Sequence, residues 1–410
     1  LIFFVVMIGI VKIEQIFIFE ISLDSDISEL KKNFFQTNSE IFNSTKPQYS
    51  ESPYTVNGHC VIPNVVEKKM ENDPERITLI LHVSFNRLDS SIEAQISNWD
   101  GPISLAVVFP PKYSPQSEEV FCSAQFLKNL QKNDSDSSLK LSAHFLLQNQ
   151  ECSESDIIQN YFPDDLDCEN LNTVIPSKSE KIKEMSEYPV NEARNLARNL
   201  SLTNFILIAD MDHLFSKNFE KKMISLAKKK LFKDPKTVLV YRIFEVVDNV
   251  TNLPETKKDL LNLYKKNQAQ EFHKYYGAHS IKDLQQWFEK SQHPENNTEI
   301  QFYQKYKSLH WEPQFVSLRT IPFHDTSFYY STRDNTVLRW EMCRAGFKFA
   351  IVDDVFMFHL GIKSSKERKL VDEVRRKVLF KARQALRKFR KRMDLLYPKT
   401  KNNCPPFDRL

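Results

Sequence analysis

The sequence predicts an α/β fold in which a mostly parallel, Rossmann-like sheet is covered by helices on both faces. Short apolar runs rich in β-branched residues are typical of buried strands, and helical patterns separate several of them. The composition agrees, because 41% hydrophobic and 12% aromatic residues in a chain of 410 can form a sizeable core. The runs are ITLILHV (77–83), SLAVVFP (104–110), LSAHFLL (141–147), FILIAD (205–210), TVLVYRIFEV (237–246) and KFAIVDD (348–354).

Helical patterns are clearest in three segments. Residues 188–200 (YPVNEARNLARNL) have Pro189 in the first turn and apolar residues at i, i+3, i+7 and i+10, which is one helix face. Residues 218–232 repeat this pattern, and residues 365–392 carry apolar residues at helical spacing within a basic stretch. Residues 250–310 are polar with scattered aromatics, and we expect an insertion or acceptor-side region with some helix.

The N-terminal part of the chain differs in composition: an apolar run is followed by a polar stretch. The apolar run LIFFVVMIGIV is shorter than the ~20 residues that span a bilayer, and we interpret residues 1–20 as a truncated signal anchor or signal peptide. A hydrophobic strand of the fold is the alternative. Residues 21–70 are polar and resemble a stem or linker, so the folded domain is expected over residues 71–404.

Cysteine usage and glycosylation sequons favour a lumenal or extracellular protein. The six cysteines are widely spaced and form no CxxC pair, which argues against a zinc cage and permits disulfides in any of fifteen full pairings. Acceptor sequons, which together are mild evidence for the secretory route, occur at Asn43, Asn133, Asn199, Asn249 and Asn296.

The spacing of the glycines and the distribution of charge argue against a glycine-rich phosphate-binding loop and against nucleic-acid binding. The six glycines are never clustered, so neither a Walker loop nor a dinucleotide fingerprint can be placed, and a bound nucleotide would have to be held another way, most simply through a metal. Residues 366–392 hold thirteen Lys/Arg and three acids, a balance of +10 in a chain of net charge +4. Because this charge is confined to one helix-like stretch, we interpret it as a solvated face and expect no nucleic-acid partner.

A pair of aspartates follows the apolar strand in NFILIADMDHLF (204–215). Residues i and i+2 of an extended chain project to one side, so Asp210 and Asp212 present two carboxylates where the strand ends, the edge at which open α/β sheets bind ligands. Two such carboxylates repel by ~4 kcal/mol at an effective dielectric near 20, and a divalent cation removes that repulsion. We therefore predict a site for Mn²⁺, with Mg²⁺ as the alternative. A plain acidic strand end is the competing interpretation.

These residues belong to a series of blocks that resembles glycosyltransferase family 49. This family comprises type II membrane enzymes related to the β-1,4-glucuronyltransferase of dystroglycan glycosylation and to the second catalytic domain of the LARGE enzymes. The resemblance covers roughly four fifths of the chain, from about residue 76 to 404. Its blocks are ITLILHVSFNRLDS, NWDGPISLAVVFP, YPVNEARNLARNLSLTNFILIADMDHLFS, WEPQFVS, FHDTSF, EMCRAGFKFAIVDDVFMFHLGIK and LLYPKTKNNC.

The resemblance implies a glycosyltransferase-A fold and an inverting, Mn²⁺-dependent transfer from a UDP-sugar, expected to be UDP-glucuronic acid, to a glycan or glycoprotein hydroxyl. It implies a Golgi membrane protein with a lumenal catalytic domain, secreted if the N-terminus is cleaved. A secreted glycan-binding protein that kept the fold and lost catalysis is the alternative. Implied metal ligands are Asp210, Asp212 and His359. Implied donor-binding residues are Arg87, Arg194, Asn195, Asp210, Gly361 and Lys363, whereas Arg198 could be a surface cation.

An inverting transfer needs a general base within reach of the acceptor hydroxyl. We favour Asp334, in STRDNT, with Asp325, in FHDTSF, orienting acceptor or donor, and Glu341 is a weaker candidate. Asp325 could instead organise its loop, and Asp334 could cap the following helix. The chain departs from the family pattern at Thr326, Ser327 and Thr332, which leaves the donor sugar and the acceptor open.

Overall fold

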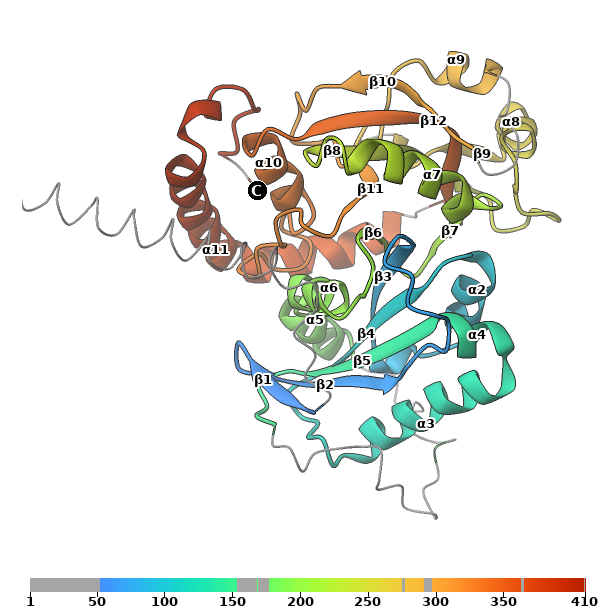
Figure 1. Ribbon diagram of the computed structural model, residues 1–410. Helices are drawn as coiled ribbons and strands as arrows, with labels where there is room; N and C mark the ends of the chain where they lie inside the picture. The colour runs from blue at the N-terminus through green and yellow to red at the C-terminus, as the bar shows by residue number, and fades with distance from the viewer. Residues whose placement is uncertain are drawn as a thin grey trace, which may run out of the picture.

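A single twelve-stranded mixed sheet runs through the protein, with helices on both faces (Figure 1). The computed structural model describes residues 52–152, 168, 177–274, 277–290, 297–362, 365–408 and 410. The strand order is β1-β2-β5-β4-β3-β6-β11-β8-β12-β10, with β7 paired to β12 and β9 paired to β8. The strands are β1 (Tyr54–Val56), β2 (His59–Val66), β3 (Ile77–Ser84), β4 (Ile103–Phe109), β5 (Leu141–Leu147), β6 (Phe205–Ile208), β7 (His213–Phe215), β8 (Thr237–Val246), β9 (Ala269–Glu271), β10 (Ile300–Gln304), β11 (Gln314–Leu318) and β12 (Lys348–Leu360).

The helices pack on the two faces of this sheet. Apolar residues of α6, α10 and α11 share one buried cluster with one face, and those of α2, α3 and α7 share another with the opposite face. The helical segments are η1 (Phe85–Arg87), α2 (Ser91–Asn98), α3 (Glu118–Asn133), α4 (Ser135–Lys140), α5 (Lys178–Glu187), α6 (Val190–Asn199), α7 (Phe219–Leu231), α8 (Lys257–Lys265), α9 (Leu284–Glu289), α10 (Thr336–Arg344), α11 (Ser365–Leu396) and η4 (Pro398–Thr400).

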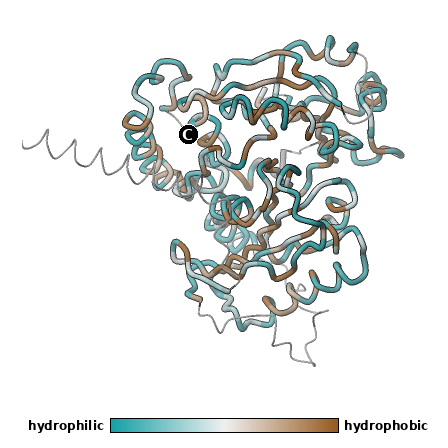
Figure 2. The backbone as a smooth tube through the Cα atoms, in the orientation of Figure 1, coloured by the Kyte–Doolittle hydropathy of each residue, from teal (hydrophilic) through white to brown (hydrophobic). Residues whose placement is uncertain are grey.

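The α/β prediction is confirmed, and each of the predicted apolar runs overlaps a strand of the sheet. Two groups of neighbouring strands are parallel: β5, β4, β3 and β6 run the same way, as do β8 and β12. Between these two parallel groups lies β11, which is antiparallel to both β6 and β8. Figure 2 shows hydrophobic residues concentrated along the central strands and hydrophilic ones on the outer helices.

The sheet extends into a stretch that we expected to be linker. Residues 54–66 form β1 and β2, a hairpin whose second strand pairs with β5, so the folded domain begins before residue 71. The hairpin turn is Asn57–Gly58 with positive φ at both residues, the combination that a tight two-residue turn needs. A register shift between Ile62 and Val66 breaks the alternation of β2 and hides the strand in the sequence. The predicted anchor at residues 1–20 lies outside the described residues. Within the part of the chain that is described, no helix is long and apolar enough to cross a membrane.

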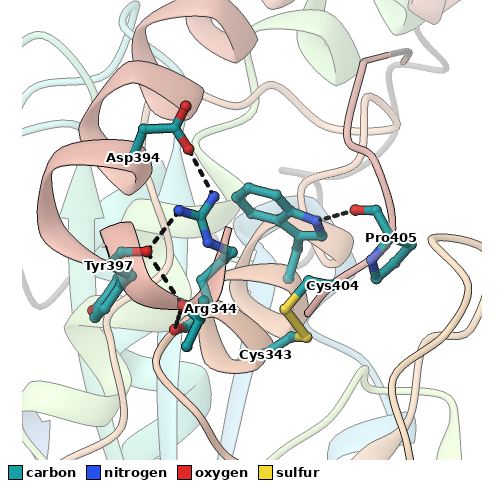
Figure 3. The surroundings of a disulfide bond; sticks show 8 residues. Cys343, Arg344, Asp394, Tyr397, Cys404 and Pro405 are labelled. Atoms are coloured by element: carbon teal, nitrogen blue, oxygen red, sulfur yellow. Dashed lines mark hydrogen bonds and ion pairs between the residues drawn. A yellow bond between two sulfur atoms is a disulfide. The ribbon is translucent and has the colours of Figure 1, made fainter. Parts of the chain in front are cut away.

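Disulfides fix three long-range connections. One of them ties the end of α10 to the C-terminal tail, and Figure 3 shows its surroundings. Next to it, the buried Arg344 guanidinium donates to Asp394 Oδ1 at 3.0 Å and to backbone carbonyls at the end of α11. The Trp340 indole N–H donates to a tail carbonyl at 2.8 Å. The pairs are Cys60–Cys152, Cys122–Cys168 and Cys343–Cys404.

Candidate metal and donor site

The two aspartates lie in the turn between β6 and β7, at the end of a central strand (Figure 1). Because β7 pairs antiparallel with β12, His213 lies directly opposite His359. This register brings a histidine from the far end of the sequence to the aspartate turn, with His359 Nε2 3.0 Å from Asp212 Oδ2. The structure therefore places His359 against Asp212, and Asp210 lies in the same turn as Asp212.

The His359 ring is held in the orientation that a metal ligand needs. Its Nδ1 lies 2.9 Å from the carbonyl oxygen of Gly361, so Nδ1 carries the proton and donates it. Nε2 is then the nitrogen that faces Asp212, where it would bind a metal in its deprotonated form, the arrangement by which a backbone carbonyl orients a ligating histidine. Gly361, whose carbonyl accepts this hydrogen bond, has φ +88, a left-handed backbone conformation that residues other than glycine rarely adopt.

A second histidine, His213, belongs to the same cluster and was not predicted. Ligand atoms of Asp210, Asp212 and His213 all lie within 4.8 Å of one another. However, His213 Nδ1 accepts the Asp210 backbone N–H at 3.4 Å, which puts the ring proton on Nε2, 3.7 Å from Asp212 Oδ1. This tautomer makes His213 a donor toward Asp212, a contact that would orient the carboxylate. Its position directly after DMD was the available signal.

The Asp212 carboxylate is kept ionised by these two rings. Burial alone would raise its pKa, but the hydrogen bond with His359 and the charges of His213 and His359 lower the pKa below its ordinary value. An ionised carboxylate is the form that binds a divalent cation.

Arg194 connects the aspartate turn with the predicted general base. Its guanidinium, on a side chain only 5% exposed, donates to Asp334 Oδ2 at 2.9 Å and to Asn191 Oδ1 at 3.1 Å, and it lies 3.6 Å from Asp210 Oδ1. Although burial acts in the opposite direction, the carboxylates of Asp334 and Asp210 raise the pKa of Arg194. Arg194 therefore lies between Asp334 and Asp210, one of the predicted metal ligands.

His82, at the end of β3, is a further member of the site that the sequence did not reveal. Its Nδ1 bonds with the Tyr188 hydroxyl at 2.9 Å, and its Nε2 lies 3.9 Å from Asp210 Oδ1. Burial, with a further contribution from the Arg194 charge, lowers the pKa of His82 to about 4, so the ring is neutral at neutral pH. In the sequence this histidine is one polar residue within an apolar strand.

The polar side of α6 holds the loop that follows β11. Asn195 binds the His324 backbone twice, donating to its carbonyl at 2.8 Å and accepting its N–H at 3.0 Å. Asn191 donates to the Asp325 carbonyl at 2.8 Å. Arg198 is not a surface cation: it is 2% exposed and donates to the Arg319, Ile321 and Pro322 carbonyls. Asn195, predicted to bind the donor, therefore has both polar atoms engaged by protein backbone.

The three candidate carboxylates differ in their surroundings. Asp325 Oδ2 forms an ion pair with Arg392 at 2.6 Å, and its Oδ1 accepts from the Ser327 N–H and hydroxyl, so this side chain organises its own loop. Asp334 lies beside the aspartate turn, and burial raises its pKa in spite of Arg194. Glu341 is buried with the Tyr397 hydroxyl 3.4 Å away, and burial raises its pKa to about 7.

The remaining predicted donor residues have different outcomes. Arg87 is exposed in η1 directly after β3. Burial raises the pKa of Tyr188 and of Tyr330, and the Arg87 charge partly opposes this rise, so Arg87 lies near the same edge of the sheet. Lys363 falls outside the described residues. At Thr332, where the family pattern suggested glycine, the buried hydroxyl donates to the Tyr329 carbonyl at 2.7 Å.

Left-handed backbone occurs on both sides of Thr332. Ser331 has φ +65 and Arg333 has φ +68. Such conformations cost of order 1–3 kcal/mol in residues other than glycine and persist where the surroundings impose them. The strain lies in the loop that carries Asp334, which places it at the candidate base.

Comparisons with known proteins identify a family. A family model described as glycosyl-transferase for dystroglycan matches residues 76–398. The β-1,4-glucuronyltransferase 1 of Danio rerio is 22% identical over 350 residues, covering 80% of this chain and 75% of its own length. The xylosyl- and glucuronyltransferase LARGE2 of Mus musculus is 24% identical over 290 residues, covering 70% of this chain and 34% of its own length.

Solved structures show only weak similarity. GalNAc-T7 with UDP, GalNAc and Mn²⁺ has 10% identity and a TM-score of 0.37, with 82% of this chain and 61% of that chain covered. Residues 1–349 of S. aureus TarS in complex with UDP have 9% identity and a TM-score of 0.33, with 80% and 73% covered. At these scores, the classification depends on the family model and the sequence relatives.

Proposed function

Because the chain belongs to the family described as glycosyl-transferase for dystroglycan, it is a glycosyltransferase, and we propose the following reaction for it. A sugar, expected to be glucuronic acid, moves from a UDP-sugar to a hydroxyl of a glycan or glycoprotein acceptor, with inversion at the anomeric carbon. The observation that carries the proposal is the 3.0 Å approach of His359 to Asp212 in the turn that also holds Asp210, at the end of a central strand. The expected fold is of glycosyltransferase-A type, which agrees with the α/β sheet and the aspartate turn.

The donor atoms fit Mn²⁺, with Mg²⁺ as the alternative. Two carboxylates and one imidazole nitrogen are hard and borderline ligands of the kind these ions accept. When bound there, the ion would neutralise the charge that develops on the UDP leaving group. His213 supports the site by orienting Asp212, and Gly361 supports it by fixing the His359 tautomer.

Asp334 is the proposed general base, which removes the proton from the attacking acceptor hydroxyl. A base with a raised pKa accepts a proton more readily, and burial raises the pKa of this carboxyl. Arg194 positions it through the 2.9 Å hydrogen bond and offers a buried cation beside Asp210, where the diphosphate would lie. Asp325 is proposed to orient the acceptor loop, since Arg392 and Ser327 occupy its oxygens.

The test measures UDP release by the full chain with Mn²⁺ and each of UDP-glucuronic acid, UDP-N-acetylglucosamine and UDP-xylose. A thermal shift in the same mixtures separates binding from turnover, because a ligand bound by the folded state alone raises its stability. We expect D334N to bind the donor like the wild type and to lose release by at least 100-fold. Donor binding with no release by the wild-type chain would instead favour an inactive glycan-binding protein.

We also propose that the enzyme works in the lumen of the Golgi, attached to the membrane through the N-terminal apolar segment. Support comes from the disulfides, which form in oxidising compartments. Fractionation of cells expressing the full chain would test this location.

A further inference from the structure

The outer face of α11 is a dense cationic surface. The helix buries Val374, Val378, Ala382 and Phe389 against the protein, and the opposite side faces solvent. Between residues 376 and 391 this side carries no acidic residue. We refer to its exposed cations as the α11 basic face: Arg376, Lys377, Lys381, Arg383, Arg387, Lys388, Arg390 and Lys391.

These charges are not balanced within the described part of the protein. None of the cations of the α11 basic face forms an ion pair with a carboxylate of a described residue, whereas Arg375 and Arg392 at its borders pair with Asp372 and Asp325. A solvated face of a soluble helix usually alternates charges of both signs. The repulsion among so many like charges on one face is relieved by binding a polyanion.

An exposed aromatic ring lies at the centre of this face. Phe380 is 68% exposed, the most exposed of the large hydrophobic side chains in the described residues. On a helix of 3.6 residues per turn, Phe380 has Arg376, Lys377, Arg383 and Arg387 one or two turns away on the same side. An aromatic ring among cations offers a flat apolar surface for a sugar ring together with partners for its anionic groups.

The α11 basic face borders the loop that carries the proposed base. Arg375 Nε donates to the Ser331 carbonyl at 3.0 Å, and the Lys381 amine lies 5.8 Å from the Tyr329 ring centre. Arg392 holds Asp325 of the same loop. A chain bound along α11 would therefore pass beside the acceptor side of the site.

The compartment in which the protein is expected to work restricts the class of polyanion that can bind. Three disulfides indicate an oxidising compartment, in which acidic glycans are common polyanions and nucleic acids are not the expected partner. We propose that the α11 basic face binds the anionic part of an extended glycan acceptor, one that carries uronate, sulfate or phosphate groups. This inference deepens the proposed function, on which it rests, by naming the substrate class.

The test is direct binding of a defined heparin decasaccharide to the full chain, measured by isothermal titration at 50 and 150 mM NaCl. The variant R376E/R383E/R387E reverses three charges of the α11 basic face. The control K229E/K258E/K265E makes the same change in net charge at exposed lysines of α7 and α8. We expect at least tenfold weaker binding and a smaller salt dependence for the first variant, and wild-type binding for the control.

Three further measurements complete the test. F380A should weaken heparin binding severalfold without changing its salt dependence, because it removes only ring contact. Equal weakening by both triple variants would overturn the inference, as would tighter binding to vesicles with 30% phosphatidylserine than to heparin. UDP release without acceptor is expected to be unchanged in R376E/R383E/R387E. A chain that binds heparin through α11 and releases no UDP would refute the proposed function and leave the binding surface standing.

Discussion

Replacement of Arg194 by methionine tests the electrostatic organisation of the site. The substitution removes the cation that lies 2.9 Å from Asp334 Oδ2 and leaves a carboxylate whose side chain is 12% exposed. The attraction lost is ~6 kcal/mol at an effective dielectric of 20. Removing one partner of a buried pair typically costs about 3–5 kcal/mol, since the remaining charge is desolvated without compensation. We expect R194M to lose stability in that range at pH 8.

The pH dependence identifies the cause. Without Arg194, the folded-state pKa of Asp334 rises further above its unfolded value, so the native state holds a proton that the unfolded state has released. The free energy of unfolding of R194M therefore falls as pH rises from the unfolded-state pKa of Asp334 to its folded-state pKa. The stability lost relative to the wild type is smaller at pH 5 than at pH 8.

Urea unfolding of the wild type, R194M, D334N and R194M/D334N at both pH values measures the coupling between the two residues. In the D334N background, R194M should cost at most about 1.5 kcal/mol, because no buried carboxylate is left without its cation. The reasoning fails if R194M costs the same with either residue at position 334, or if its cost does not depend on pH.

Two further predictions concern the C-terminal half of the fold. Burial raises the pKa of Glu341 to about 7 from an ordinary value of 4.5, so stability falls as pH rises through that window. E341Q should match the wild type at pH 4.5 and exceed it by at most about 3 kcal/mol at pH 8; urea midpoints that differ equally at both pH values would contradict this. C343S/C404S opens a connection across 61 residues of sequence, and we expect a loss of about 4 kcal/mol by the same measurement. An unchanged midpoint would show that the tail packs without its disulfide.

The local features of the fold and of the site could be predicted from the sequence. Apolar runs located the central strands, and the DMD turn located the aspartates proposed to bind metal, because a strand end and two carboxylates are local properties. His359 was predicted as a third ligand from the resemblance to a family, because no rule of residue spacing connects it with the two aspartates. The structural reason is the pairing of β7 with β12.

Features that depend on tertiary packing could not be predicted from the sequence. The role of Arg198 depends on backbone carbonyls more than a hundred residues away, and a basic residue on a helix gives no sign of them. His82 reaches Asp210 because β3 and β6 are neighbours in the sheet. The β1–β2 hairpin, in contrast, did have a local signal in Asn57–Gly58.

The central claim is that a divalent cation binds to Asp210, Asp212 and His359. The most direct measurement is isothermal titration of Mn²⁺ in the presence of UDP to the wild type, D212N, H359Q and H213Q. We expect at least 100-fold weaker binding for D212N and H359Q, a smaller loss for H213Q, and the wild-type thermal unfolding temperature without metal for D212N. Wild-type Mn²⁺ affinity in a folded D212N variant would contradict the account.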